Sequence, residues 1–282
     1  MFTFPAYVIT MKSSEEQMLI KEYIYEHGFV KISLFQGVDG KKVDLDNDIL
    51  LTPYARAVID GKLKRKNSAV LCSRGAVGCF LSHQTIWKNF LSTDSQWCAI
   101  FEDDVRFNKS FQKDFVPLWN DVRTHTDDPL MLNLGFGPLS PHTTIHQEGK
   151  RYDVLQGIFW GLHSYIINRA AARKMLTNTD IYDVQVDTHI SLCKGLRILC
   201  PRRNLTSQQL RYLESSTQTK CLVCLLPANN MFYALSISIF IFLFAIGIYA
   251  SSYNKDLQLT LIIGLSVLAC AQYETYRNSK SF

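Results

Sequence analysis

The sequence lacks the features that would assign it to several common classes of protein. Its start, Met1-Phe-Thr-Phe-Pro5, has no basic stretch followed by an apolar run, so we expect no secretory signal peptide. The eight cysteines show no disulfide-framework spacing, which favours a reducing compartment. The net charge of +5 is modest for 282 residues, and the one dense basic run, at 62–66, is expected to be a solvated loop. Nucleic-acid binding is therefore not expected.

Near its end the sequence contains two long stretches without charge. Residues 231–250 are apolar on every face of a helix and, at about 1.5 Å per residue, would extend roughly 30 Å, the thickness of a bilayer's hydrocarbon core. Residues 257–273 form the second stretch. We predict two transmembrane helices in a hairpin; the alternative is two buried helices of a globular domain. Basic residues on both sides of the hairpin predict a multi-pass membrane protein whose main domain and tail are cytosolic.

The rest of the chain reads as a globular domain, because 47% hydrophobic and 20% charged residues allow a packed core. Strand and helix patterns alternate, which predicts an α/β fold with a mixed, mainly parallel sheet. The expected strands are 6–10, 30–35, 97–101, 130–134, 159–167 with an interruption at Gly161, and 197–200. The expected helices are 13–26, a short one near 54–60, 75–91, 110–124, 169–176 and one within 184–194. In helix 13–26, Met18, Leu19, Tyr23 and Ile24 are expected to point inward. The predicted domains are 1–216 (catalytic), 217–230 (juxtamembrane linker), 231–273 (transmembrane hairpin) and 274–282 (tail).

Three adjacent carboxylates follow the apolar strand 97–101: Glu102, Asp103 and Asp104. An unpaired carboxylate is costly to bury, so these acids need water, a cationic partner or a bound metal. A hard divalent ion such as Mg²⁺ or Mn²⁺, sharing its ligands with a diphosphate, fits that chemistry. The alternative is a solvated acidic turn. Because neighbouring strand residues face opposite sides of a sheet, an alternative for Glu102 is that its side chain points back into the sheet and away from the metal.

A glycine-rich helix start precedes this strand. Gly75 and Gly78 allow backbone amides to approach a ligand closely. Arg74, just ahead of them, is a candidate for contact with a diphosphate, with a surface arginine as the alternative. His83 either orients an acid or contacts phosphate, or is a hydrogen-bonded structural histidine. Cys79 is expected to belong to the core.

These motifs, taken together and in order, resemble glycosyltransferase family 25 over about residues 5 to 216. The family includes bacterial lipooligosaccharide galactosyltransferases and collagen galactosyltransferases. The matching segments are Tyr7-Val-Ile-Thr10, Gly37-Val-Asp39-Gly40, Gly75-Ala-Val-Gly78-Cys79-Phe-Leu-Ser82-His83 followed by Trp87, Phe101-Glu102-Asp103-Asp104-Val105, Gly161-Leu-His-Ser-Tyr165-Ile-Ile-Asn-Arg169 with 170–176, the late Asp187, and a closing segment of Pro201 with Gln208 or Gln209 and Ser215.

The resemblance implies a GT-A-like fold that uses a UDP-sugar, expected to be UDP-galactose, with Mn²⁺ or Mg²⁺. The implied metal ligands are Asp103, Asp104 and Glu102, with Asp104 also in a catalytic role and Asp103 or Asp104 at the donor ribose. Asp187 is the expected catalytic base, with a helix cap as its alternative. Expected contacts to the donor are Lys12, Asp39, Arg74, Gly75, Gly78 and His83, and possible third metal ligands are His163 and His189.

The sequence departs from the family pattern at two positions. Lys12 stands alone where the family has arginine-rich sequence, and Ala76 stands where an acid is frequent. Both departures concern the identity of the sugar-nucleotide donor more than the fold. The predicted function is metal-dependent, inverting hexosyl transfer to a hydroxyl on a glycan, a lipid-linked sugar or a protein. The alternatives are a catalytically silent, membrane-anchored binding or scaffold protein, and a metal-dependent phosphodiester hydrolase.

Overall fold

A computed structural model describes residues 1–47, 49–67, 69–137, 143–177 and 182–208. The chain divides into two compact units, 1–225 and 226–282, and all described residues belong to the first. The predicted linker, transmembrane hairpin and tail lie outside the described residues. Within the described part of the chain, no helix has both the length and the apolar character that a membrane span requires.

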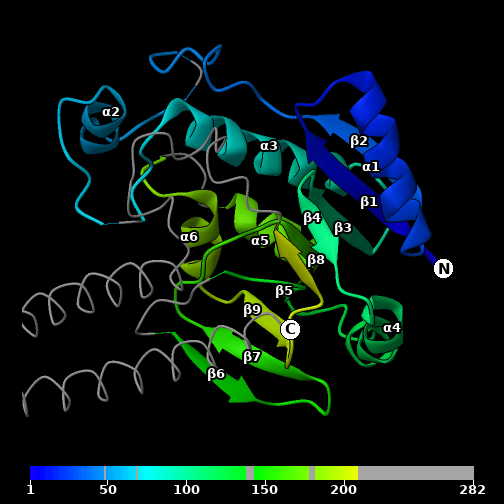
Figure 1. The fold of residues 1–282 in the computed structure, drawn as a ribbon. Helices are drawn as coiled ribbons and strands as arrows, with labels where there is room; N and C mark the ends of the chain where they lie inside the picture. Colours follow the sequence, from blue (N-terminus) through cyan, green and yellow to red (C-terminus); the bar gives the residue numbers. More distant parts are fainter. Residues whose placement is uncertain (48, 68, 138–142, 178–181, 209–282) are drawn as a thin grey trace, which may run out of the picture. The chain divides into compact units, whose positions relative to one another are not determined.

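The described part of the chain is an α/β domain, as predicted (Figure 1), although helices and strands do not alternate strictly and the described residues of 123–168 form only strands and loops. In chain order they are β1 (Phe2–Thr10), α1 (Ser14–Glu26), β2 (Phe29–Gln36), α2 (Pro53–Ile59), α3 (Arg74–Leu91), β3 (Trp97–Glu102), β4 (Val105–Phe107), α4 (Phe111–Val122), β5 (Leu130–Asn133), β6 (Thr144–Gln147), β7 (Tyr152–Gln156), β8 (Ser164–Asn168), α5 (Arg169–Leu176), α6 (Val186–Ser191), β9 (Arg197–Pro201) and β10 (Thr206–Gln208).

The strands form an eight-stranded mixed sheet in the order β2-β1-β3-β8-β5-β9-β7-β6. Strands β1, β2 and β3 are parallel neighbours, as are β5 and β9, whereas β8 and β7 pair antiparallel with their neighbours. Six of the eight strands therefore run in one direction, which confirms the predicted mixed, mainly parallel sheet. The short strands β4 and β10 pair separately, in antiparallel fashion.

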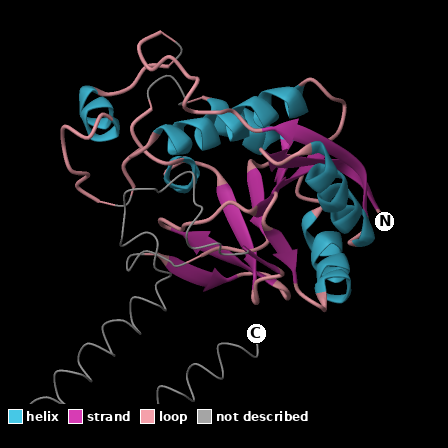
Figure 2. Ribbon diagram, turned by 45° about the horizontal axis from the view of Figure 1, so that its top comes forward, coloured by secondary structure: helices cyan, strands magenta, loops and turns pink. Residues whose placement is uncertain are grey.

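Helices cover the sheet on both faces (Figure 2). The buried side chains of the strands alternate between two cores. In β3, Cys98 and Ile100 face one core together with buried residues of α3, α5 and α6. Ala99 and Phe101 face the other core together with residues of α1 and α4. The period of two places the next residue, Glu102, on the α3 side of the sheet.

Several details differ from the expectations. Met18 and Leu19 of α1, expected to point inward, are 62% and 63% exposed, and among the expected inward residues of this helix only Ile24 is fully buried. The interruption expected at Gly161 is confirmed, because this glycine adopts a left-handed φ of +96°, but the strand is present only after it, from Ser164. The short strands β4, β6, β7 and β10 were not predicted.

Two of the sequence motifs meet in one close contact. The turn at residues 37–40 crosses α3 at Gly78, where a Cβ atom would lie 2.3 Å from the Val38 carbonyl oxygen and 2.7 Å from the Gly40 nitrogen. The Ser82 hydroxyl, one turn further along the helix, accepts a hydrogen bond from the Val38 amide at 2.8 Å. Gly78 thus has a packing role: it lets the turn lie directly on the helix.

Replacement of Gly78 by alanine tests this contact. Overpacking typically costs roughly 1–3 kcal/mol of stability. We expect the loss in this variant to lie near the upper end of that range, since the backbone of both the helix and the turn must move. That loss outweighs the roughly 1 kcal/mol that alanine gains over glycine in a helix. Thermal denaturation followed by circular dichroism measures it. In the control, Gly37→Ala, the added Cβ meets the flexible Met11 side chain at 3.1 Å, so little change is expected. Equal midpoints for the two variants would contradict this reading.

Candidate active site

Polar residues collect where β1 and β3 end side by side. β1 ends at Thr10 and β3 at Glu102, and the acids Asp103 and Asp104 follow directly. Asp103 is turned toward β1: its Oδ2 atom accepts a hydrogen bond from the Thr10 hydroxyl at 2.8 Å. The Lys12 ammonium lies 3.1 Å from the Asp103 carbonyl oxygen and 3.7 Å from its Oδ1. Asp103 is therefore anchored on β1 and the segment after it.

Glu102 and Asp104 converge on a different partner. The side-chain amide nitrogen of Gln208, in β10, donates to Asp104 Oδ2 at 2.8 Å and to Glu102 Oε2 at 3.5 Å. One side-chain amide thus lies between two carboxylates. Among the described residues, Gln208 is the one side chain that donates a hydrogen bond to both acids. The predicted set of three metal ligands is divided, with Glu102 and Asp104 together and Asp103 apart.

Asp104 has the most unusual surroundings of the three acids. Its Oδ1 atom is buried and has no hydrogen-bond partner among the described residues. Burial, and then the charge of Glu102, raise the pKa of Asp104 to about 7, although the Gln208 amide opposes the shift. A buried carboxylate oxygen without a partner, next to a second carboxylate, fits a hard divalent cation such as Mn²⁺ or Mg²⁺.

His83 holds Glu102 from the other side. The His83 ring is fully buried, with Nδ1 at 2.8 Å from the Tyr165 hydroxyl and Nε2 at 3.4 Å from Glu102 Oε1. The indole of Trp87 donates to the same Tyr165 oxygen at 3.0 Å. Because indole only donates, the Tyr165 proton is free to serve His83 Nδ1, so we assign the imidazole proton to Nε2, facing Glu102.

This chain of hydrogen bonds has an electrostatic consequence for Glu102. Burial raises the pKa of the Glu102 carboxyl. The hydrogen bond from His83 and the electrostatic effect of the His83 and His163 rings together lower it by more, so the pKa of Glu102 lies below its usual value. Glu102 therefore remains ionised at neutral pH beside an Asp104 that is only partly ionised. The prediction that His83 orients an acid agrees with this geometry.

Asp187 lies in the first turn of α6. Its carboxylate accepts hydrogen bonds from the Thr188 amide at 2.7 Å and the Gly161 amide at 3.3 Å. Burial raises the pKa of Asp187 to about 6, against the effect of these bonds, and the charge of Glu102 adds to the rise. Both amides hold the carboxylate in place without neutralising it, which suits a general base at neutral pH.

The two histidines expected as third metal ligands differ in position. His163 is 3% exposed, and its backbone oxygen accepts from the Glu102 amide at 2.9 Å. Its Nδ1 atom is buried and without a partner in the described residues, while Nε2 lies 3.3 Å from the Thr206 hydroxyl. His189 instead lies 3.0 Å from the Met175 carbonyl oxygen and stacks on Trp87. The structure thus brings His163, rather than His189, close to the acids.

The expected donor contacts lie in several places. Arg74 donates to the Val43 carbonyl oxygen at 2.9 Å, and Asp39 accepts from the Lys41 amide at 3.0 Å, so both brace the loop that follows β2. Gly75 lies in the first turn of α3, where Ser73 caps the helix by accepting from the Ala76 amide. The geometry brings Lys12 to the acids, whereas Arg74, at the start of α3, and Asp39 both make their contacts with the loop that follows β2.

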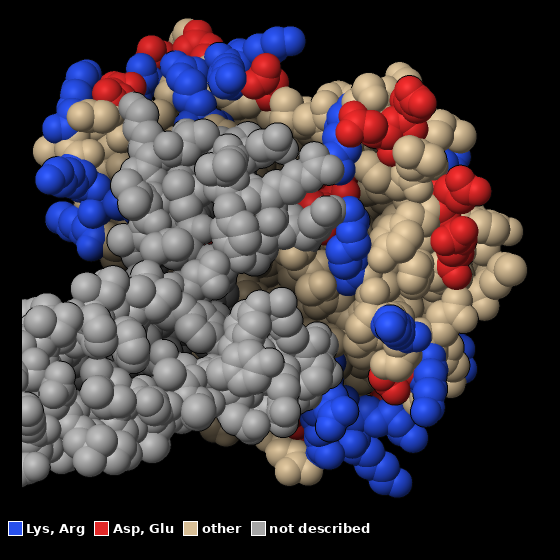
Figure 3. All heavy atoms as spheres, in the orientation of Figure 1, with Lys and Arg blue, Asp and Glu red and all other residues tan. Residues whose placement is uncertain are grey.

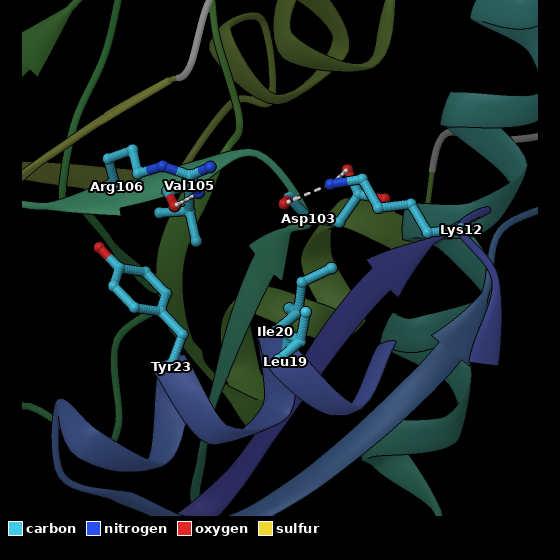
Figure 4. A pocket seen from close by; sticks show the side chains of 7 residues that line it. All are labelled: Lys12, Leu19, Ile20, Tyr23, Asp103, Val105 and Arg106. Carbon is cyan, nitrogen blue, oxygen red and sulfur yellow. Dashed lines mark hydrogen bonds and ion pairs between the residues drawn. The ribbon is translucent and has the colours of Figure 1, made fainter. Parts of the chain in front are cut away.

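A surface pocket of about 250 Å³ lies beside Asp103, on the α1 side of the sheet (Figure 4). Lys12 and Asp103 form one end, and Arg106, whose guanidinium lies 5.7 Å from the Tyr23 ring centre, forms the other. The remaining lining residues are Leu19, Ile20 and Val105. The pocket combines cations with an apolar and aromatic floor, a combination that suits an anion attached to a ring.

Charges of both signs are scattered over the face drawn in Figure 3, and basic side chains gather over the part of the chain that carries α2. The basic run after α2 is largely exposed loop, with Lys62 paired to Asp60 at 3.3 Å and Lys66 over the Tyr54 ring. This confirms the predicted solvated loop.

Sequence reasoning did not predict Thr10, Gln208 or Tyr165 as parts of the site. Thr10 and Gln208 are ordinary polar residues of β-strands, and only the pairing of β1 with β3 and of β10 with β4 brings them to the acids. Tyr165 was quoted as part of a motif without a role. A tyrosine followed by two isoleucines in an expected strand was the available signal, since a buried hydroxyl needs a partner.

Other proteins share part of this sequence. The profile of Glycosyltransferase family 25 (LPS biosynthesis protein) matches residues 4–190. The chain is 33% identical over 110 residues to the probable inactive glycosyltransferase 25 family member 3 of Rattus norvegicus, covering 39% of this chain and 19% of that protein. It is 30% identical over 111 residues to procollagen galactosyltransferase 2 of Homo sapiens, covering 39% and 17%. It is 31% identical over 111 residues to the lacto-N-neotetraose biosynthesis glycosyltransferase LgtE of Neisseria meningitidis serogroup B, covering 38% and 40%. The chain thus spans less than half the length of each of these relatives.

The raised pKa of Asp104 predicts a pH-dependent effect of Asp104→Asn on stability. In the wild type the folded-state pKa lies above the unfolded one, so stability is lost as pH rises from about 4 through 7, while the amide does not titrate. We expect the variant to gain on the order of 2 kcal/mol relative to wild type between pH 5 and pH 8. Urea denaturation with chelator present measures this gain. The exposed Asp94→Asn serves as control, and a difference that stays flat with pH would refute the prediction.

Proposed function

Because the chain belongs to glycosyltransferase family 25, we propose that it is a glycosyltransferase that moves a hexose, expected to be galactose, from a UDP-sugar to an acceptor hydroxyl. The Glu102–Asp104 pair at the end of β3 carries this proposal, with its buried oxygen that lacks a partner among the described residues. The diphosphate of a nucleotide sugar is a leaving group whose growing charge needs a cation, and this pair can hold one.

Asp104 and Glu102 are the proposed ligands of a divalent metal ion. When bound, Mn²⁺ or Mg²⁺ would neutralise the charge that develops on the diphosphate. Asp103 has a different proposed role, because Thr10 and Lys12 already anchor it. We assign Asp103 and Lys12 to the nucleotide, with the Lys12 ammonium available to an anionic oxygen. The pocket beside them, lined also by Tyr23 and Arg106, supports this assignment.

Asp187 is the proposed base for inverting transfer. In that reaction the acceptor oxygen forms a bond to the anomeric carbon while the bond from that carbon to the diphosphate oxygen breaks. The acceptor hydroxyl gives its proton to the base, and the diphosphate keeps the bonding electron pair. With a pKa of about 6, Asp187 is largely ionised at neutral pH and still basic enough to accept the proton.

The named relatives support the reaction class and leave the acceptor broad. One is named a procollagen galactosyltransferase and one a lacto-N-neotetraose biosynthesis enzyme, so a protein hydroxyl and a glycan hydroxyl are both proposed acceptors. A lipid-linked sugar is the third. The proposed localisation is a membrane, through the hairpin predicted at 231–273, with the catalytic domain in the cytosol; the uncharged stretches 231–250 and 257–273 support it.

A catalytically silent protein is the second candidate, because the relative from Rattus norvegicus is named as probably inactive. The lone Lys12 and Ala76 agree with that reading. The acid pair favours the enzyme, since a binding protein has no use for a buried carboxylate oxygen without a partner.

A panel of nucleotide sugars, with release of UDP as the readout, tests the proposal. We expect the full-length chain to release UDP from a UDP-sugar in the presence of Mn²⁺ or Mg²⁺, and to stop when the ion is chelated. Asp104→Asn should lower the rate by at least roughly 100-fold, because it removes a charge that stabilises the leaving group. The exposed Asp94→Asn should leave the rate unchanged. Absence both of turnover and of metal-dependent nucleotide binding would sink the enzyme reading in favour of the silent one.

The proposed base predicts the acid limb of the pH–rate profile. The rate should fall about tenfold per pH unit below about pH 6, as Asp187 becomes protonated. Asp187→Asn should lower kcat by about 10²–10⁴-fold and remove this limb. The exposed neighbour Asp183→Asn is the matched control. If the rate of the Asp187→Asn variant still fell below about pH 6 as in the wild type, the catalytic base would have to be another residue.

A further inference from the structure

A second group of metal-ligating side chains lies on the α3 side of Glu102. Cys79 and His83 are four residues apart in α3, so they lie one above the other on the same face of the helix. The Cys79 sulfur, a ring nitrogen of His83 and a carboxylate oxygen of Glu102 all lie within 4.8 Å of one another. We propose that these three residues bind a thiophilic divalent cation of the zinc class.

The donor set carries the choice of metal. One thiolate, one imidazole and one carboxylate form the mixed sulfur, nitrogen and oxygen set that zinc accepts in tetrahedral sites, whereas Mg²⁺ and Mn²⁺ prefer oxygen alone. Three protein ligands leave a fourth position for water or another ligand. Binding is balanced in charge, because the Cys79 thiol releases its proton to solvent and two anionic ligands then neutralise the ion.

The surroundings of His83 match those of a metal-bound histidine. Metal-binding histidines use their second nitrogen to hydrogen-bond a fixed partner, and Nδ1 lies 2.8 Å from the Tyr165 hydroxyl. When Nε2 gives its electron pair to the metal, its proton moves to Nδ1, which then donates to the Tyr165 oxygen, while the Tyr165 O–H bond rotates away from the ring. That oxygen has two lone pairs, so it also keeps the bond from Trp87.

Glu102 separates this site from the one proposed for the diphosphate. Its Oε1 atom faces His83, and its Oε2 atom faces the Gln208 amide that also binds Asp104. The two carboxylate oxygens therefore point to different ligand sets, one soft and one hard. Cys79 and Glu102 are partly exposed residues, whereas His83 is buried. Cys79 has no hydrogen-bond partner among the described residues that would compete with the metal.

Cobalt binding tests the site without reference to catalysis. We expect Co²⁺ added to the metal-free full-length chain to produce a sulfur-to-cobalt charge-transfer band in the near ultraviolet, and Zn²⁺ to remove the band by displacement. Cys79→Ser should abolish the band. Cys72→Ser, a partly exposed cysteine outside the group, should retain it. Tyr165→Phe should weaken metal affinity by roughly 10-fold or more, through loss of the partner of His83.

The wild-type chain provides an independent readout that needs no variant to fold. Zn²⁺ should protect Cys79 from alkylation, measured by mass spectrometry, while Mg²⁺ should not. Asp104→Asn should keep the cobalt band, since Asp104 belongs to the other ligand set. A wild type without the band, a band that persists in Cys79→Ser, or a band lost in Asp104→Asn would each overturn the proposal. None of these results depends on sugar transfer, so they stand apart from the test of the proposed function.

Discussion

The free energy needed to keep carboxylates at the end of a buried strand is the constraint on which this site depends. β3 is buried from Trp97 to Phe101, and three acids follow its last buried residue. A buried carboxylate without partners would cost several kcal/mol, a large part of a total stability of about 5–15 kcal/mol. The fold meets this cost with donors from different elements: Thr10 of β1, His83 of α3 and Gln208 of β10. The acids thereby connect three distant parts of the chain.

Helix α3 serves two surfaces at once because of its period. Gly78 and Ser82 lie one turn apart and meet the turn at 37–40, which packs on the helix through glycine contacts. Cys79 and His83 lie one residue further along and face Glu102. A shift of one position, about 100° around the helix, separates the packing stripe from the ligand stripe. The packing of the turn therefore fixes the rotation of α3, and that rotation aims His83 at the acid.

The sequence was sufficient for most of the fold and for the centre of the site, for local physical reasons. Runs such as 97–101 and the glycine-rich helix carry their periodicity within a few residues, so β3, α3 and the position of the acids were predictable. What failed depends on contacts distant in the chain. The partner of Asp104 lies 104 residues away in a three-residue strand with no signal of its own. Met18 and Leu19 looked buried because they are apolar, yet α1 turns them to the surface.

The division of the three acids bears directly on the choice between an enzyme and a silent protein. Asp103 needs no metal ion as a partner, because Thr10 and Lys12 already contact it. Asp104 is not, since a buried oxygen of its carboxylate lacks a partner among the described residues and its pKa is raised to about 7. A protein without use for a cation would lose little, and often gain stability, if such a group were replaced by an apolar residue. The argument for metal-dependent chemistry therefore depends on Asp104 and its neighbour Glu102, and only secondarily on Asp103.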